Sequence, residues 1–99
     1  MKLDTNRYQR QIQLKEIGSV GQDKIAHAKV LVIGAGGLGC PALQYLAAAG
    51  VGTIGIVDFD VVEMSNLQRQ ILYTVDDIGQ SKAITACKKL RLLNPEIKI

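Results

Sequence analysis

The chain has too few metal-binding and redox side chains to build a metal centre or a disulfide framework. Its 99 residues include one histidine and two cysteines, and Cys40 and Cys87 are separated by almost half of the sequence. Neither a CxxC motif nor a set of zinc ligands can be assembled from these residues. We therefore expect no metal site within the chain, and two buried, reduced thiols in a cytoplasmic protein.

Aromatic residues and clustered charge are also scarce. The sequence has no tryptophan, one phenylalanine and three tyrosines, and its net charge of +3 comes from basic residues spread along the chain. Domains that bind nucleic acid combine a basic stripe with side chains that stack on bases or read a groove. The sequence therefore argues against a nucleic-acid partner.

Long apolar runs are missing as well. The longest apolar stretch, residues 46–57, is interrupted by three glycines and a threonine, and the N-terminus lacks the apolar segment of a signal peptide. We expect a chain that is neither secreted nor inserted into a membrane.

What the chain does contain is typical of a globular protein. It is 47% apolar and 21% charged, and its length suffices for one domain at most. Residues 29–34 form a short unbroken apolar run that suits a buried parallel strand. A helix rich in Leu and Ala is expected over 38–49, ended by Gly50, and a second strand over 53–59. Together these segments predict a βαβ unit.

Further elements are predicted on both sides of this unit. A helix over residues 81–93 is followed by the start of a third strand at 97–99, and two short helices at 7–14 and 22–28 come before the first strand. The order is that of an α/β fold: the first half (βαβαβ) of a Rossmann-like, doubly wound parallel sheet, preceded by N-terminal helices.

The pattern of residues 81–93 predicts an amphipathic helix. Its expected apolar face consists of Ala83, Ile84, Ala86, Cys87, Leu90 and Leu93. Its expected polar face consists of Thr85, Lys88, Lys89 and Arg91.

A glycine motif lies between the first strand and its helix. Residues 34–39, GAGGLG, match G-x-G-x-x-G. In this motif Gly34 permits the tight turn, Gly36 allows the backbone to approach a phosphate, and Gly39 allows helix and strand to pack closely. Gly37 is a further candidate cofactor-binding residue of the loop. The free N–H groups at the start of the helix, together with the helix dipole, favour a bound anion.

Asp58 ends the second strand, where a carboxylate can accept hydrogen bonds from a ribose hydroxyl. The glycine loop and Asp58 together predict a nucleotide site, but they do not separate a dinucleotide redox cofactor from a nucleoside triphosphate. A triphosphate that is cleaved requires several cations near the developing negative charge. Arg69, Lys82 and Arg10 are the candidates for that role.

Five segments of the sequence resemble the ubiquitin-activating-enzyme-like adenylyltransferases, the family of the bacterial ThiF, MoeB and HesA proteins. They are RYQRQ at 7–11, GAGGLG at 34–39, DFD at 58–60, SNLQRQ at 65–70 and GQSK at 79–82. The combination of DFD with SNLQRQ is highly specific. On this resemblance residues 1–99 are the N-terminal, ATP-binding part of such a domain.

The resemblance implies a reaction and its partners. ATP would adenylate the C-terminal glycine carboxylate of a ubiquitin-like sulfur-carrier protein, with pyrophosphate released, in molybdopterin or thiamine synthesis. It also implies a homodimer, Mg²⁺ held by an aspartate beyond residue 99, and in a full-length form the option of Zn²⁺ on CxxC pairs. Neither Cys40 nor Cys87 matches a catalytic position of the family.

The resemblance also assigns roles to individual residues. Asp58 resembles the ribose-binding acid, Arg69 the main phosphate cation, and Lys82 a second cation at the start of its helix. Asn66 resembles a residue that orients phosphate oxygens. Arg10 resembles the arginine that reaches into the site of the neighbouring protomer.

Other interpretations stay open at this point. Arg7 and Arg10 fit a solvated helix face, residues 68–70 fit an exposed turn, and Lys82 fits a solvated helix start. At the level of function, the glycine loop and Asp58 also fit an NAD-binding module of an oxidoreductase. A third alternative is a non-catalytic piece that serves in dimerisation or in docking of a carrier protein.

Overall fold

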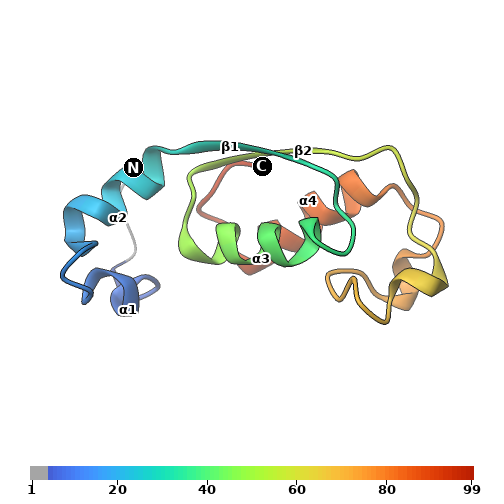
Figure 1. Cartoon of the computed structure of the whole chain (residues 1–99), viewed down its shortest axis with the longest axis horizontal. Helices are drawn as coiled ribbons and strands as arrows, with labels where there is room; N and C mark the ends of the chain where they lie inside the picture. The colour runs from blue at the N-terminus through green and yellow to red at the C-terminus, as the bar shows by residue number, and fades with distance from the viewer. Residues whose placement is uncertain (1–4) are drawn as a thin grey trace.

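The computed structural model describes residues 5–99 of the chain. The helices are α1 (Gln9–Ile12), α2 (Gly18–His27), α3 (Gly39–Ala49) and α4 (Lys82–Leu93), and the strands are β1 (Lys29–Ile33) and β2 (Thr53–Val57). Two short 3-10 turns, η1 (Met64–Asn66) and η2 (Val75–Asp77), lie between β2 and α4. The predicted α/β fold and βαβ unit are confirmed (Figure 1).

The sheet is parallel, and β2 lies between two neighbours. On one side Lys29 pairs with Thr53 and Ile33 with Val57. On the other side Lys98 forms a parallel bridge to Thr53, and its carbonyl accepts a hydrogen bond of 2.8 Å from the Ile54 amide. Residues 97–99 therefore take the predicted direction and position of a third strand, although a single bridge is too short to count as one.

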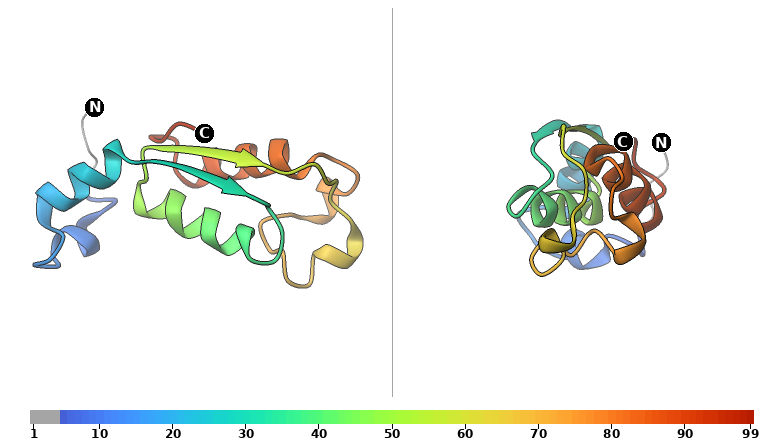
Figure 2. Two further views of the ribbon diagram at one scale, coloured as in Figure 1. Left: turned by 45° about the horizontal axis from the view of Figure 1, so that its top comes forward. Right: turned by 90° about the vertical axis from the view of Figure 1, so that its right-hand side faces the viewer.

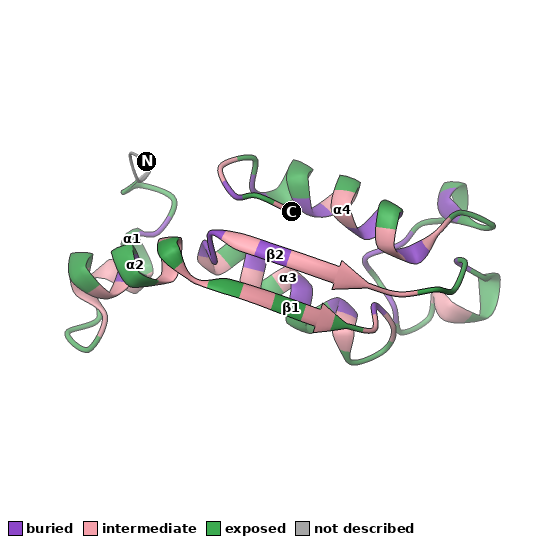
Figure 3. Cartoon of the chain, turned by 90° about the horizontal axis from the view of Figure 1, so that it is seen from above, coloured by how far each residue is buried: buried purple, intermediate pink, exposed green. Residues whose placement is uncertain are grey.

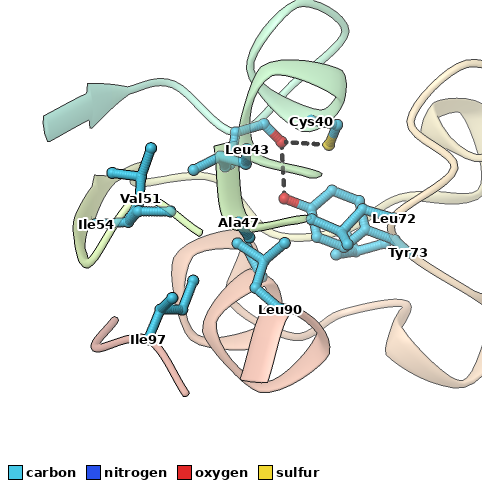
Figure 4. Close-up of a cluster of buried hydrophobic side chains, with 12 residues drawn as sticks. Cys40, Leu43, Ala47, Val51, Ile54, Leu72, Tyr73, Leu90 and Ile97 are labelled. Atoms are coloured by element: carbon cyan, nitrogen blue, oxygen red, sulfur yellow. Dashed lines mark hydrogen bonds between the residues drawn. The ribbon is translucent and has the colours of Figure 1, made fainter. Parts of the chain in front are cut away.

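Both long crossover helices pack against one face of the sheet (Figure 2). Successive crossovers of the same hand place their helices on the same face. The core between the layers includes Leu43 and Ala47 of α3, Ile54 of β2 and Leu90 of α4, each at most 1% exposed (Figure 4). Burial of this apolar surface supplies the main driving force for folding.

The opposite face of the sheet is uncovered within residues 5–99 (Figure 3). Leu31 and Ile33 of β1 are 61% and 79% exposed, whereas Val30 and Val32 on the other face pack against the core. Side chains alternate between the faces of a strand. The apolar run of β1 is thus buried on one side only, which differs from the expectation of a strand buried on both.

The N-terminal helices differ from the prediction. The first is limited to Gln9–Ile12, and the second begins at Gly18 rather than at residue 22, with Gly21 inside it. Glycine lowers helix propensity by about 1 kcal/mol, but docking of a helix onto its neighbours can override that preference. Here a Cβ at Gly21 would lie 3.0 Å from a methyl carbon of Ile17, so the turn is tightly packed.

The amide side chains of the buried Gln22 and the half-buried Gln11 anchor the N-terminal helices to the end of α3. The side chains of Gln11 and Gln22 both donate to the Ala49 carbonyl at 3.0 Å, and Gln11 also donates to the Gln22 side-chain oxygen at 2.7 Å. The last carbonyls of a helix lack partners within the helix. These amides therefore cap α3 and fix α1 and α2 at that end of the molecule.

The buried face of α4 differs from the predicted face. Thr85 is 2% exposed, whereas Ile84 is 60% exposed and Leu93 44% exposed. Ala86 and Leu90 are buried as expected. The buried stripe is therefore rotated by about one residue and includes Thr85 together with Ala86 and Leu90, the two residues through which α4 joins the core. Within residues 5–99, none of the helices has the length and apolar character needed to span a membrane.

Candidate functional site

The predicted glycine loop and Asp58 meet at the carboxyl edge of the sheet. Gly34 has a φ of +97°, and its amide donates to the Val57 carbonyl at 2.7 Å. A side chain at Gly39 would overlap the Gly34 carbonyl oxygen. The tight turn at Gly34 and the close packing at Gly39 are therefore confirmed, since glycine alone tolerates these two positions.

The Asp58 carboxylate joins the two strand ends. One oxygen accepts a hydrogen bond from the Ala35 amide at 2.8 Å, and the other accepts one from the Asp60 amide at 2.7 Å. Each carboxylate oxygen can accept more than one hydrogen bond. The side chain is thus held in a fixed direction while it keeps acceptor capacity for a hydroxyl group.

Backbone pairing brings the GQSK segment to the DFD segment. Val61 forms an antiparallel bridge with Ser81, and the Lys82 amide donates to the Asp60 carbonyl at 3.0 Å. The Ser81 hydroxyl accepts a hydrogen bond of 3.3 Å from the Ile84 amide, as an N-cap of α4. The start of α4 is therefore fixed beside the end of β2.

Lys82 is 6% exposed, so the interpretation of a solvated helix start is wrong. Its side chain lines an open pocket of about 370 Å³ beside the Asp58 loop. The other lining residues are Phe59, Asp60, Val61, Glu63 and Asn66. Among residues 5–99, no carboxylate lies within ion-pair distance of the Lys82 ammonium. A buried cation without a counter-charge favours an anionic ligand.

Asn66 ends the η1 turn in the same pocket. Its side-chain oxygen accepts a hydrogen bond of 2.8 Å from the Glu63 amide. The oxygen is thus used to shape the turn. The amide NH₂ group, which donates to no acceptor within residues 5–99, remains for a ligand oxygen.

Arg69 and Gln70 pack along the glycine loop. The Arg69 Nε atom lies 3.6 Å from the position that a Cβ of Gly37 would occupy, and the Gln70 side-chain nitrogen lies 3.6 Å from that of Gly36. The Arg69 guanidinium also donates to the Ser65 carbonyl at 3.1 Å. Since Gln70 is 3% exposed, the interpretation of an exposed turn is wrong for this residue.

Sequence reasoning missed three residues that shape the loop: Ala35, Tyr73 and Cys40. The Tyr73 hydroxyl donates to the Ala35 carbonyl at 2.7 Å and the Cys40 thiol donates to the same oxygen at 3.2 Å, the two dashed lines of Figure 4. Burial raises the pKa of the Cys40 thiol and of the Tyr73 hydroxyl above their ordinary values. Both groups therefore stay protonated as donors, and Cys40 has no character of a nucleophile. A signal was present, because tyrosine is rare in this chain and Tyr73 follows SNLQRQ closely.

Arg10 is not brought to this site. It is exposed on α1, at the opposite end of the long axis from residues 60–80 (Figure 1). Nearby, Arg7 forms an ion pair of 3.7 Å with Glu96. The structure therefore places Asp58 and Arg69 beside the glycine loop and Asn66 and Lys82 in the adjoining pocket, and it leaves Arg10 apart from both.

A metal site of protein side chains is not formed by the described part of the chain. No three His, Cys, Asp or Glu side chains of residues 5–99 gather closely enough to hold an ion. The described residues therefore form no metal cage of protein side chains.

Comparison with known proteins gives close relatives. Over 98 residues the chain is 52% identical to a "Sulfur carrier protein adenylyltransferase" of Thermus thermophilus, covering 99% of this chain and 36% of the relative. Over 93 residues it is 57% identical to the "Probable adenylyltransferase/sulfurtransferase MoeZ" of Mycobacterium tuberculosis, covering 94% of this chain and 24% of that protein. The chain thus spans about a third or less of the length of these relatives.

Solved structures share the fold. E. coli MccB, solved with ATP, matches 98% of this chain and 30% of its own with a TM-score of 0.86 and 36% identity. TcdA (CsdL) matches 95% of this chain and 36% of its own with a TM-score of 0.88 and 33% identity. The family model described as "ThiF family" matches residues 8–99. With that match over nearly its whole length, the chain belongs to the ThiF family.

Proposed function

We propose that the chain forms the ATP-binding part of an adenylyltransferase that activates the C-terminal glycine carboxylate of a ubiquitin-like sulfur-carrier protein. The relatives named as adenylyltransferases of sulfur-carrier proteins support this reaction. The observation that carries the proposal is the buried Lys82, which lines the pocket with Asn66 and has no carboxylate of residues 5–99 within ion-pair distance. A dinucleotide needs the carboxylate and the glycine loop, but a buried cation in addition to them has its clearest use on a triphosphate.

The reaction transfers the adenylyl group to the carrier. A carboxylate oxygen of the carrier attacks the α-phosphorus of ATP, the bond from that phosphorus to the bridging oxygen breaks, and pyrophosphate leaves. In this proposal Asp58 binds the ribose, while the N–H groups of Gly36 and Gly37 face the phosphates. Lys82 and Arg69 stabilise the charge that develops on the leaving pyrophosphate.

Arg10 acts from a second copy of the chain in this proposal. Arg10 is exposed, and its helix α1 lies at the opposite end of the long axis from residues 60–80 of the same chain (Figure 1). A homodimer that places α1 of one protomer beside the glycine loop of its partner would add a third cation. The chemistry is that of an arginine supplied in trans to a phosphate transition state.

Titration of the chain with ATP plus Mg²⁺, and separately with NAD, tests the site. We expect binding of ATP and not of NAD, and Arg69→Ala is expected to weaken ATP binding about tenfold or more through the loss of a charge-assisted contact. Arg91→Ala serves as the control, since Arg91 does not line the pocket beside Lys82. It lies on α4 and donates a hydrogen bond of 2.8 Å to the Ile99 carbonyl. Binding of NAD without ATP would favour the redox module instead. Binding of a carrier protein without any nucleotide would favour the docking piece.

Mixing two inactive variants tests the contribution in trans. In the complete enzyme, Arg10→Ala and Lys82→Ala should each lose most ATP–pyrophosphate exchange. A mixture allowed to exchange protomers should recover part of it, because one site of the mixed dimer then contains both residues. Failure of the mixture to regain activity, with mixed dimers shown by mass spectrometry, would contradict a role of Arg10 in trans.

A further inference from the structure

We propose that Tyr73 is a positioning residue of the nucleotide site, which acts by fixing the Ala35 peptide of the glycine loop. This inference rests on the proposed function and adds to it a residue that touches neither ribose nor phosphate. Tyr73 is 3% exposed, and its hydroxyl donates to the Ala35 carbonyl at 2.7 Å.

Ala35 is held from both sides. Its amide donates to Asp58 at 2.8 Å, and its carbonyl accepts from Tyr73 and from the Cys40 thiol. Ala35 is fully buried and lies between Gly34 and Gly36. Glycines restrict the backbone least, so hydrogen bonds at Ala35 determine the shape of this part of the loop.

The hydrogen bond of Tyr73 also bears on the groups that would meet the nucleotide. A rotation of the Ala35 backbone would move its N–H away from Asp58 and would redirect the following amides of Gly36 and Gly37. Those two amides donate to no backbone acceptor within residues 5–99. The Tyr73 oxygen also lies 3.5 Å from the Lys82 carbonyl, so the same side chain contacts the loop and the start of α4.

Cys40 is the weaker of the two donors. A thiol is a poor hydrogen-bond donor in comparison with a phenol. Removal of the Tyr73 hydroxyl therefore leaves the Ala35 carbonyl with a weak partner only. A buried carbonyl without its main donor is no longer held in one orientation, so the loop loses its single preferred conformation.

The three tyrosines of the chain provide matched controls. Tyr8 is also buried, and its hydroxyl accepts from Asn94 at 2.8 Å and donates to Glu96 at 3.3 Å, at the far end from the glycine loop. Tyr45 is 78% exposed on α3. The same Tyr→Phe change thus removes a buried hydroxyl at the loop in Tyr73, a buried hydroxyl far from the loop in Tyr8, and an exposed hydroxyl in Tyr45.

The experiment compares Tyr73→Phe, Tyr8→Phe and Tyr45→Phe by ATP titration, urea unfolding and hydrogen exchange of the Ala35 amide. We expect Tyr73→Phe to weaken ATP binding about five- to tenfold and to speed exchange at Ala35 by a similar factor beyond any change in global stability. Tyr8→Phe is expected to lower stability while it leaves the local exchange at Ala35 unchanged. Tyr45→Phe is expected to resemble the parent chain.

Unchanged local exchange at Ala35 in Tyr73→Phe, or equal losses of ATP affinity in Tyr73→Phe and Tyr8→Phe, would overturn the inference. Absence of ATP binding by the parent chain would instead overturn the proposed function, and the exchange at Ala35 would still decide whether Tyr73 fixes the loop. Should Tyr73→Phe fail to fold, Cys40→Ala removes the second donor to the same oxygen. Cys40→Ala is expected to speed hydrogen exchange at the Ala35 amide, and Cys40→Ser, which keeps a donor, is expected to restore the parent rate. Cys87→Ala, at a half-buried cysteine, is the control.

Discussion

Gly36 and Gly39 lie in one loop but differ in what a side chain would meet. A Cβ at Gly36 would contact only the end of the Gln70 side chain at 3.6 Å, and Gly36 has no positive φ, whereas a Cβ at Gly39 would overlap the Gly34 carbonyl. We predict that Gly39→Ala lowers the free energy of unfolding by about 3 kcal/mol or prevents folding, since backbone cannot move aside cheaply.

Gly36→Ala should leave the free energy of unfolding within about 0.5 kcal/mol of the parent chain, because the methyl group fits. Its effect should fall on ATP affinity, where the methyl group keeps the phosphate from the loop amides. Urea unfolding and nucleotide titration of the two variants measure the difference. A large loss of stability in Gly36→Ala would show that this glycine is needed by the fold rather than by a ligand.

Thr85 buries a hydroxyl that has no hydrogen-bond partner within residues 5–99. Such a group loses its contacts with water and gains none in the protein. We predict that Thr85→Val, which keeps the shape and replaces the hydroxyl by a methyl group, raises the free energy of unfolding by about 1 kcal/mol. Ser81→Ala should lower the free energy of unfolding, because the Ser81 hydroxyl caps α4. A destabilised Thr85→Val would indicate that the hydroxyl has a partner after all.

At the scale of elements, the η2 turn is held by one carboxylate. Asp77 accepts hydrogen bonds from the amide and hydroxyl of Thr74 at 2.8 and 3.1 Å, and its carboxylate lies 3.1 Å from the Lys89 ammonium on α4. Burial acts to raise the pKa of Asp77, but the hydrogen bonds from Thr74 and Lys89 outweigh it and lower that pKa below its ordinary value. The turn is thereby tied to α4.

The lowered pKa of Asp77 gives a pH dependence with a definite sign. The carboxylate stabilises the fold fully above the ordinary pKa of 3.8, and this contribution is lost as the pH falls through the lower pKa of the folded state. We predict that Asp77→Asn is less stable than the parent chain at pH 7 and that the difference shrinks in strong acid. Urea unfolding at several pH values measures it, with the exposed Asp76→Asn as control. A difference that stays constant down to the acid range would exclude the charge as the cause.

The elements that could be predicted from the sequence have local signals. The glycine loop, the strand runs and the stop of α3 at Gly50 each depend on a few neighbouring residues. The start of α2 at Gly18 and the burial of Thr85 could not be predicted, because both depend on packing against segments far away in the chain. The same reason hid Tyr73, whose role requires Ala35, a residue 38 positions away.

At the scale of the molecule, the residues of the site could be predicted from the sequence, but the backbone pairing that brings them together could not. The residues of the pocket were found by motif, yet the pairing of residues 60–62 with 79–82 has no sequence signal of its own.

The molecule is elongated, 42 × 21 × 19 Å, with a radius of gyration of 14.3 Å. A compact chain of this length has about 13 Å. The length of the molecule is what separates Arg10 from the pocket.

The uncovered face of the sheet should bind apolar probes. We predict that the chain enhances the fluorescence of an apolar dye, and that Ile33→Lys reduces this signal while it changes the free energy of unfolding by no more than about 0.5 kcal/mol, because Ile33 is largely exposed. Val32→Lys is the comparison. Val32 precedes Ile33 and faces the core, so its replacement by lysine should destabilise the fold. Equal destabilisation by both variants would mean that the two faces of β1 are covered alike.

The contacts of Arg7 and Tyr8 join the two ends of the chain, with partners 86 to 88 positions away. A ribosome makes the N-terminal residues first and Asn94 and Glu96 more than eighty residues later. Until then the Tyr8 hydroxyl lacks its hydrogen-bond partners Asn94 and Glu96, although α3 and the sheet can already begin to form. The bonds of Gln11 and Gln22 to the Ala49 carbonyl can form once α3 has been made, so the N-terminal helices can dock early. The bonds of Tyr8 to Asn94 and Glu96 are a late step of biosynthesis that completes this docking.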